Sequence, residues 1–416
     1  MSTAIVVGAT GILGREIVKQ LSKTPEKWKT IYALSRSKKD EYPANVVHKH
    51  VDLLSSAEQM GKDLEGIDAE YIFFTAYLQK DTEQANWDVN GDMLDNFLKA
   101  VPHTKTKRIL LVTGAKQYGV HLGQPKNPLL ESDPWLTGTD FPPNFYYRQQ
   151  EILHNFCAQS GPGNPSKITW TVTYPNDVIG FATGNFMNLA TGIGLYVAVT
   201  KELNPNPPDT TKPTPLPFPG SQIFYTRFDT FTSARLHATF SEWAITAPGA
   251  TNQAFNVVNG DAQTWSDLWP RVAHRYGMHV PPDQFTSPAS SLAQSKQLHT
   301  PPPISVAVEE AGLVGTTVGQ EPSVLSQRVN LVKWSQQTEV KDAWGRLAER
   351  EGLQREAFEQ ATWGFVDFVL GREYDIVQSM SKAREAGWMG YEDTWKSFED
   401  VFDELEAAKV IPARKP

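Results

Sequence analysis

The chain has 416 residues, of which 40% are hydrophobic and 21% charged, so it is neither disordered nor of low complexity. This length predicts about two or three domains, or one large α/β domain with added elements. The formal net charge of −8 provides no general basic surface, which argues against nucleic acid or an anionic membrane as a partner.

Strand and helix patterns alternate along the first part of the chain. The first expected strand, 4–7, ends at a glycine, and apolar residues at helical spacing follow directly. Such alternation is typical of a parallel sheet covered by helices on both faces, so we expect an α/β fold with a Rossmann-type doubly wound sheet. The other expected strands are 30–35, 46–53, 71–76, 108–113 and 170–174, with helices over 89–100 and 149–158.

The alternation weakens beyond about residue 185. Proline-rich stretches at 204–219 and 281–303 predict connectors, and the chain after them is helical in pattern and rich in tryptophan. We therefore expect a smaller, mostly helical C-terminal region that binds substrate. The expected division is a Rossmann-type domain over 1–185, with a contribution from about 222–262, and a substrate-binding or lid region over 186–221 and 263–416.

No segment is predicted to direct the chain out of the cell or into a membrane. The apolar run at the N-terminus is too short for a signal peptide. The most apolar stretch, 186–200, spans about 15 residues, whereas a membrane helix needs about 20. A single cysteine, Cys157, excludes an intramolecular disulfide and a cysteine cluster for a metal. These features favour a cytoplasmic protein with no metal site.

A glycine loop joins the first strand to the first helix. Gly8, Gly11 and Gly14 lack a Cβ, so the backbone can turn tightly, approach a pyrophosphate and pack the helix against the sheet. The first turn of the helix offers free N–H groups to the anion. The loop therefore predicts a dinucleotide, with contacts from Gly8, Thr10, Gly11, Ile12, Leu13 and Gly14.

The end of the second strand indicates which dinucleotide is preferred. An NAD site usually has Asp or Glu there, but this chain has Ser35, Arg36 and Ser37, which suit a 2′-phosphate. We therefore predict NADP(H). The ends of the third and fourth strands add the other expected cofactor residues, Asp52 and Leu53 at the adenine and Thr75, Ala76 and Tyr77 near a ribose.

Three motifs resemble extended short-chain dehydrogenases/reductases, and within them the progesterone 5β-reductase/iridoid synthase-like (PRISE) family. They are Thr-Gly-Ala-Lys-Gln-Tyr at 113–118, Asn-Phe-Tyr-Tyr at 144–147 and Tyr-Pro-Asn-Asp-Val-Ile-Gly-Phe at 174–181. In this family the lysine follows the fifth strand instead of lying four residues after the tyrosine, where this chain has Gln150. Tyr174 stands where the family has arginine.

The resemblance implies that Tyr146 and Lys116 are catalytic. It also adds Thr113, Pro175 and Val178 to the expected cofactor contacts. A phenol beside a cation can stabilise the negative charge that develops on a carbonyl oxygen when hydride adds to the β-carbon of an enone. We expect Lys116 to lower the pKa of Tyr146 and to hold the nicotinamide ribose.

The expected substrate is a hydrophobic carbonyl compound, such as a terpenoid, steroid or polyketide-like molecule. The residues expected to line its pocket are Tyr118, Phe181, Phe186 and Met187. An NADPH-dependent enone or enal reductase is the leading hypothesis. A carbonyl reductase, a redox-neutral cyclase or isomerase and a cofactor-sensing protein remain as alternatives, and a homodimer is left open.

Overall fold

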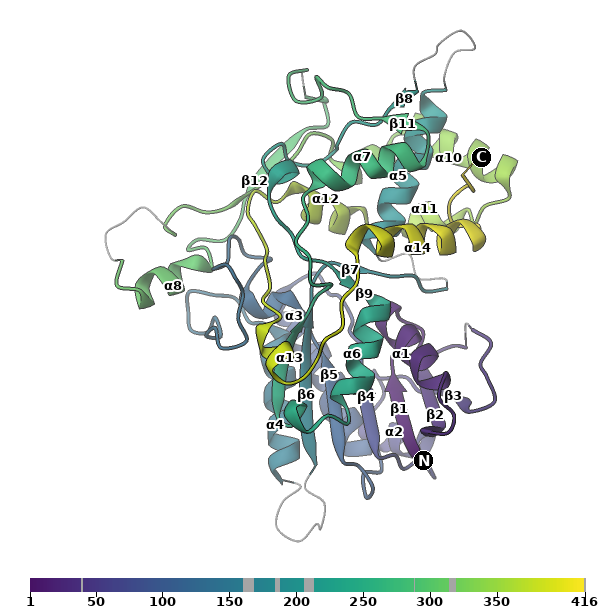
Figure 1. Ribbon diagram of the computed structural model, residues 1–416, viewed down its shortest axis with the longest axis vertical. Helices are drawn as coiled ribbons and strands as arrows, with labels where there is room; N and C mark the ends of the chain where they lie inside the picture. The colour runs from purple at the N-terminus through teal and green to yellow at the C-terminus, as the bar shows by residue number, and fades with distance from the viewer. Residues whose placement is uncertain are drawn as a thin grey trace.

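A sheet of seven parallel strands lies at the centre of the dinucleotide-type domain (Figure 1). Its order is β10-β6-β5-β4-β1-β2-β3. The strands β1 to β3 are added in one direction, and β4 then lies on the other side of β1, as in doubly wound sheets. The computed structural model describes residues 1–38, 40–159, 168–183, 188–205, 213–287, 289–313 and 319–414. The strands are β1 (Ser2–Val7), β2 (Trp28–Ser35), β3 (Val46–His50), β4 (Tyr71–Phe74), β5 (Arg108–Val112), β6 (Thr169–Pro175) and β10 (Gln253–Val257).

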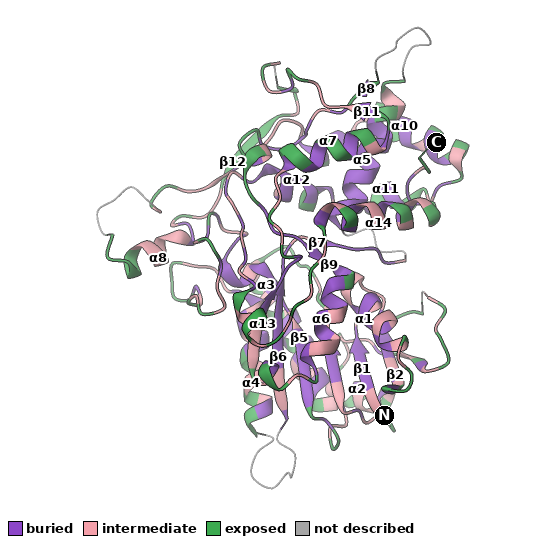
Figure 2. Ribbon diagram, viewed as in Figure 1, coloured by how far each residue is buried: buried purple, intermediate pink, exposed green. Residues whose placement is uncertain are grey.

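All six strands predicted from the sequence are present, and β3 ends at His50 rather than at residue 53. Alternate residues of β1 face opposite sides of the sheet: Ala4 and Val6 join one hydrophobic cluster, and Ile5 and Val7 join another. This period of two explains why a short apolar run forms a strand buried on both faces, as Figure 2 shows for the central strands.

Helices cover both faces of the sheet. On one face α1 (Ile12–Ser22) packs beside α6 (Ala234–Ala244), because Ile17 and Phe240 share a cluster with Val6. The other face is covered by α2 (Ala57–Asp63), α3 (Glu83–Ala100) and α4 (Phe145–Gln159). The α/β Rossmann architecture predicted from the sequence is thus confirmed.

The seventh strand comes from far along the chain. β10 pairs in parallel with β6 and forms an edge of the sheet, and α6 packs against α1, so residues 234–257 belong to the dinucleotide-type domain. The short elements between β6 and β10 include β7 (Val178–Ile179), η2 (Phe224–Thr226), β9 (Thr232–Ser233) and η3 (Pro248–Ala250), of which η2 contacts α7 and α12 of the C-terminal region.

The C-terminal region is mostly helical and has its own core. α5 (Leu189–Leu203) lies at its centre and is buried from Leu189 to Thr200, which accounts for its apolar sequence. The tryptophans Trp334, Trp344 and Trp363 pack around it as core residues. The other elements are β8 (Thr214–Pro215), α7 (Trp265–Arg275), β11 (Met278–His279), β12 (Gln294–Gln297), α8 (Ile304–Glu310), β13 (Val324–Gln327), α9 (Leu331–Gln336), α10 (Thr338–Glu351), α11 (Glu356–Gln360), α12 (Trp363–Gly371), α13 (Ser381–Glu385) and α14 (Thr394–Ala407).

One segment of this region packs on the sheet instead. Met380, directly before α13, and Ala383, within it, belong to the hydrophobic cluster formed with α1, α6 and β1. α13 also contacts β10 (Figure 1). Gln378 donates a hydrogen bond to the carbonyl of Tyr174 at the end of β6. The chain therefore returns to the dinucleotide-type domain after α12, which the division predicted from sequence did not include.

Candidate active site at the carboxyl ends of the parallel strands

The glycine loop lies between β1 and α1 and takes a conformation that needs glycine. Gly8 has φ +80°, and a Cβ added to Gly14 would lie 2.2 Å from the carbonyl oxygen of Gly8. Thr75 braces the loop, because its hydroxyl donates to the carbonyl of Val7 at 2.7 Å. Gly11 caps α1 without a side chain, so the first turn can offer its N–H groups to an anion.

The segment that follows β7 packs against the end of this loop. A Cβ on Gly180 would lie 2.3 Å from Cγ2 of Ile12, so the chain after β7 passes directly against the start of α1. Thr10 and Leu13 lie beside it and are half-buried.

The turn after β2 carries the residues expected at a 2′-phosphate. Arg36 and Ser37 are exposed, whereas Ser35 is buried and donates to the carbonyl of Ser37 at 2.9 Å. His48 Nε2 lies 2.9 Å from the Ser35 hydroxyl, and His50 Nδ1 lies 2.8 Å from the carbonyl of Arg36. The two histidines of β3 therefore brace the turn and leave the Arg36 guanidinium open to a ligand.

Two further expected cofactor positions follow β3 and β4. Asp52 and Leu53 are half-buried directly after β3, and Asp52 accepts a hydrogen bond from the N–H of Leu54 at 3.1 Å. Ala76 is half-buried after β4, and Tyr77 is 51% exposed. Thr113, after β5, is buried, and its hydroxyl donates to the carbonyl of Thr173 at 3.2 Å.

The structure brings Tyr146 and Lys116 to one place. Lys116 lies in η1 (Ala115–Tyr118), directly after β5, and Tyr146 lies in the first turn of α4. Asn144 joins the two segments, because its amide donates to the carbonyl of Lys116 at 2.7 Å and accepts from the N–H of Tyr146 at 3.1 Å. A Cβ on Gly114 would lie 3.1 Å from the Tyr146 hydroxyl and 3.2 Å from the carbonyl oxygen of Pro175. The phenol thus reaches the ends of β5 and β6.

The ammonium of Lys116 does not act on Tyr146 as predicted. It forms an ion pair with Glu83 of α3, with Nζ 3.2 Å from Oε1, and lies 5.7 Å from the ring centre of Phe145. Burial, with smaller contributions from Tyr77 and Glu83, raises the pKa of Tyr146. Lys116 is not among the groups that shift this pKa, so the lowering predicted from the sequence is not seen, and the phenol keeps its proton at neutral pH.

Aromatic rings surround the phenol. Phe145 lies 4.4 Å from Tyr146 between ring centres and stacks on Tyr77 at 6.1 Å with an interplanar angle of 7°. Tyr147, the next residue of α4, points elsewhere. Its hydroxyl donates to the carbonyl of Gln117 at 2.7 Å and accepts from the N–H of Leu136 at 3.0 Å. Of the two adjacent tyrosines, only Tyr146 faces the strand ends.

A buried ion cluster fixes the segment between Pro175 and Val178. Arg372, which has no exposed surface, pairs with Asp177 and with Asp229, the latter at 2.9 Å. Burial raises the pKa of the Asp229 carboxyl, and the Arg372 charge opposes this shift. The C-terminal region therefore holds the chain beside the Tyr146 hydroxyl.

Tyr118 lies in the core, which differs from the pocket-lining position expected from the sequence. Its hydroxyl donates to Oδ1 of Asn256 at 2.7 Å, and burial raises its pKa well above the usual value. The ring lies edge-on to Tyr174. An amide on β10 thus satisfies this hydroxyl inside the fold, so it is not directed at a substrate.

Two departures from known motifs contact one another: Tyr174 stands where the resembled family has arginine, and Gln150 stands where ordinary short-chain dehydrogenases have lysine. Tyr174 donates to Oε1 of Gln150 at 2.6 Å, and the amide of Gln150 donates to Oε1 of Gln117 at 2.8 Å. Gln150 occupies the position where a Tyr-x-x-x-Lys motif would place its lysine. A buried lysine there would have no carboxylate in this network, whereas glutamine satisfies both neighbours.

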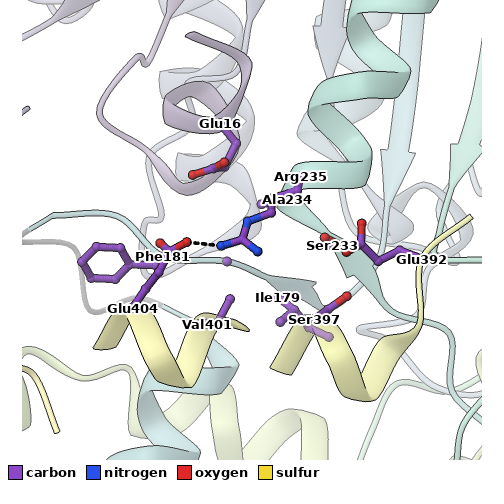
Figure 3. Close-up of a pocket in the computed structure, with 11 residues that line it drawn as sticks. Glu16, Ile179, Phe181, Ser233, Ala234, Arg235, Glu392, Ser397, Val401 and Glu404 are labelled. Atoms are coloured by element: carbon purple, nitrogen blue, oxygen red, sulfur yellow. Dashed lines mark hydrogen bonds and ion pairs between the residues drawn. The ribbon is translucent and has the colours of Figure 1, made fainter. Parts of the chain in front are cut away.

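Phe181 lies beside α1 rather than at the phenol. The guanidinium of Arg15 is 5.0 Å from its ring centre. Figure 3 shows Phe181 at a small crevice where Arg235 of α6 points between Glu16 of α1 and Glu404 of α14. The expectation that Phe181 lines the substrate pocket is not supported by this position. Phe186 and Met187 lie outside the described residues.

A larger cavity of about 460 Å³ opens in the C-terminal region, and none of the expected site residues lines it. The residues around it are Gln222, Tyr225, Thr226, Val280, Pro281, Pro282, Gln284 and Phe285. Within the described ranges, no three His, Cys, Asp or Glu side chains gather as metal ligands would. Likewise, none of the helices placed by the structure is long and apolar enough to span a bilayer.

Comparison with known families assigns the chain. The model of the PRISE-like Rossmann-fold domain matches residues 4–292. The chain belongs to this family. Its resemblance to progesterone 5β-reductase and iridoid synthase-like proteins is thereby confirmed.

Relatives match the chain from end to end. An uncharacterized protein of Schizosaccharomyces pombe is 39% identical over 98% of both chains. The 3-oxo-Δ(4,5)-steroid 5β-reductase of Arabidopsis thaliana is 28% identical and is matched over 99% of this chain and 93% of its own. The (S)-8-oxocitronellyl enol synthase of Nepeta racemosa has the same identity and coverage. The chain thus belongs to a Rossmann-fold enzyme family of the oxidoreductase or epimerase type.

A solved structure shares the fold over the whole length. The Bordetella bronchiseptica enzyme WbmG, in complex with NAD and UDP, superposes with a TM-score of 0.55 at 12% identity. The match covers 99% of this chain and 96% of that one.

Three contributors to the site were not identified from the sequence. Two of them are His48 and His50, because the alternating pattern of a strand does not indicate which residue a histidine contacts. Glu83 follows Thr82, whose hydroxyl accepts from the N–H of Ala85 at 3.1 Å, so it reads as an ordinary acid in the first turn of a helix.

Proposed function

We propose that this protein is an NADPH-dependent short-chain dehydrogenase/reductase that reduces a C=C bond conjugated to a carbonyl in a hydrophobic small molecule. One observation carries the proposal: a protonated phenol, Tyr146, reaches the carboxyl ends of β5 and β6 next to Lys116. The named activities of the 5β-reductase and enol synthase relatives support the same chemical class.

The glycine loop fits a dinucleotide, because any Cβ on Gly8 or Gly14 would fill the space that the loop needs. A bound reduced nicotinamide supplies the hydride. When hydride adds to the β-carbon, the electrons of the C=C bond move to the carbonyl oxygen, and Tyr146 stabilises the resulting enolate by hydrogen bonding. A proton added at the α-carbon then gives the saturated carbonyl compound.

The cofactor preference is tested by Arg36→Ala. We expect the dissociation constant of NADPH to rise about tenfold or more, given about 1.5–3 kcal/mol for a charge-assisted hydrogen bond, and that of NADH to change little. Titration calorimetry with both nucleotides measures this. Lys62→Ala, an exposed cation of α2 that pairs with Glu58, is the matched control. Equal weakening of both nucleotides by Arg36→Ala would rule out contact with the 2′-phosphate.

Stoichiometry tests the reaction itself. We expect one NADPH to be consumed for each product formed from an enone, with deuteride from labelled NADPH at the β-carbon. A carbonyl reductase would instead deliver the label to the carbonyl carbon and give an alcohol. A redox-neutral cyclase or isomerase is the second candidate, because the Tyr146 phenol at the strand ends could polarise a carbonyl and so assist ring closure. Product formed at full rate with NADP⁺, or without nucleotide, would establish a redox-neutral enzyme.

A further inference from the structure

Glu83 is held firmly at the site, although it begins a surface helix. It is the first residue of α3, and the Lys116 ammonium lies 3.2 Å from its Oε1. The amide of Asn86 donates to its other carboxylate oxygen at 3.4 Å. Both oxygens therefore have partners, and the carboxylate is fixed from two directions.

This ion pair differs from the surface pairs of the same helix. The side chains of Lys116 and Glu83 are only 24% and 26% exposed, whereas Lys99 and Asp95 at the other end of α3 are 61% and 37% exposed. A half-buried pair is screened less by salt and water than an exposed one. Phe145 confines the pair further, because its ring lies 5.7 Å from the Lys116 ammonium.

Three other titratable groups around Lys116 carry no negative charge, so they do not compete with Glu83 for the ion pair. Tyr146 stays protonated because burial and the Glu83 charge raise its pKa. Tyr77 stays protonated because burial raises its pKa. His121, in the loop after η1, is kept neutral by burial and by the Lys116 charge, which lower its pKa well below the usual value. In the part of the chain that the structure describes, Glu83 is the carboxylate that pairs with this lysine.

We propose that Glu83 is a positioning residue that holds the Lys116 ammonium in place to bind the nicotinamide ribose. An ammonium has three N–H donors on a flexible stem. Glu83 takes one donor, so the other two are oriented before the ribose hydroxyls arrive, and less side-chain freedom is lost on binding. This inference rests on the proposed function, because it takes Lys116 as the ribose-binding residue.

Glu83→Gln tests the proposal by nucleotide binding. We expect the dissociation constant of NADPH to rise about three- to tenfold, as when one long side chain must be newly ordered. Adenosine 2′,5′-bisphosphate lacks the nicotinamide ribose, so its dissociation constant should stay unchanged. Asp95→Asn, which removes a carboxylate that lies 2.5 Å from Lys99 on the same helix, should affect neither ligand. Equal weakening of both ligands, or no change for NADPH, would overturn the proposal.

A double mutant shows whether Glu83 acts through Lys116. Once Lys116→Ala has weakened NADPH binding, adding Glu83→Gln should cause no further loss. Additive losses would mean that Glu83 acts independently and would refute the positioning role. Tight NADPH binding by the wild type without turnover of any enone would instead count against the proposed function, and the two titrations would still decide the role of Glu83. A wild type that binds no NADPH would overturn both.

Discussion

Tyr146→Phe should lower kcat about 10²–10³-fold, the loss typical of one donor to a developing oxyanion. The dissociation constant of NADPH should stay within a few-fold, because the phenol is expected to act on the substrate carbonyl. The thermal midpoint should not fall, since the structure gives the Tyr146 hydroxyl no hydrogen bond within the fold among the described residues. Steady-state kinetics, a nucleotide titration and thermal unfolding measure the three quantities.

Tyr147→Phe is the matched control on the same helix. Its hydroxyl bonds to the carbonyl of Gln117 and the N–H of Leu136, so its loss leaves two buried backbone groups unsatisfied, at about 1–3 kcal/mol each. We expect a lower thermal midpoint with kcat nearly unchanged. Near-normal turnover by Tyr146→Phe, or an equal loss of turnover in both variants, would show that Tyr146 is not the hydrogen-bond donor to the carbonyl oxygen.

Gly14→Ala should abolish tight nucleotide binding. The added Cβ would lie 2.2 Å from the Gly8 carbonyl oxygen and 2.8 Å from the Thr75 hydroxyl. The first of these is backbone and cannot rotate away, so α1 must move from the loop, at a cost of about 1–3 kcal/mol or more in stability. We expect NADPH binding to weaken at least tenfold, because the loop would no longer fit a pyrophosphate. Titration calorimetry and thermal unfolding measure both effects.

Gly61→Ala provides the control for adding a methyl group. Gly61 lies within α2, and its nearest neighbour to an added Cβ is the Ala100 carbonyl oxygen at 3.9 Å. Alanine favours a helix over glycine by about 0.5–1 kcal/mol, so this variant should be slightly more stable and should bind NADPH normally. Normal NADPH binding by Gly14→Ala would contradict the close approach of α1 to the glycine loop.

The sequence by itself determined the first six strands of the sheet and their order along the chain. Strands such as β1 follow from short apolar runs, and helices such as α1 from apolar residues at helical spacing. The glycine loop was predictable because three glycines between a strand and a helix satisfy a local steric need. The motifs around Lys116 and Tyr146 also identified the family, since they are contiguous stretches of sequence.

Only the tertiary structure decided which polar side chains meet. Glu83 lies 33 residues before Lys116, and the helical pattern of α3 does not indicate that the two side chains form an ion pair. Tyr118 and Phe181 are aromatic residues within the motifs, yet Tyr118 bonds to Asn256 in the core and Phe181 packs under Arg15. Periodicities of 2 and 3.6 residues specify the face of an element that is buried. They do not specify the atom that lies opposite, because that depends on how distant segments pack together.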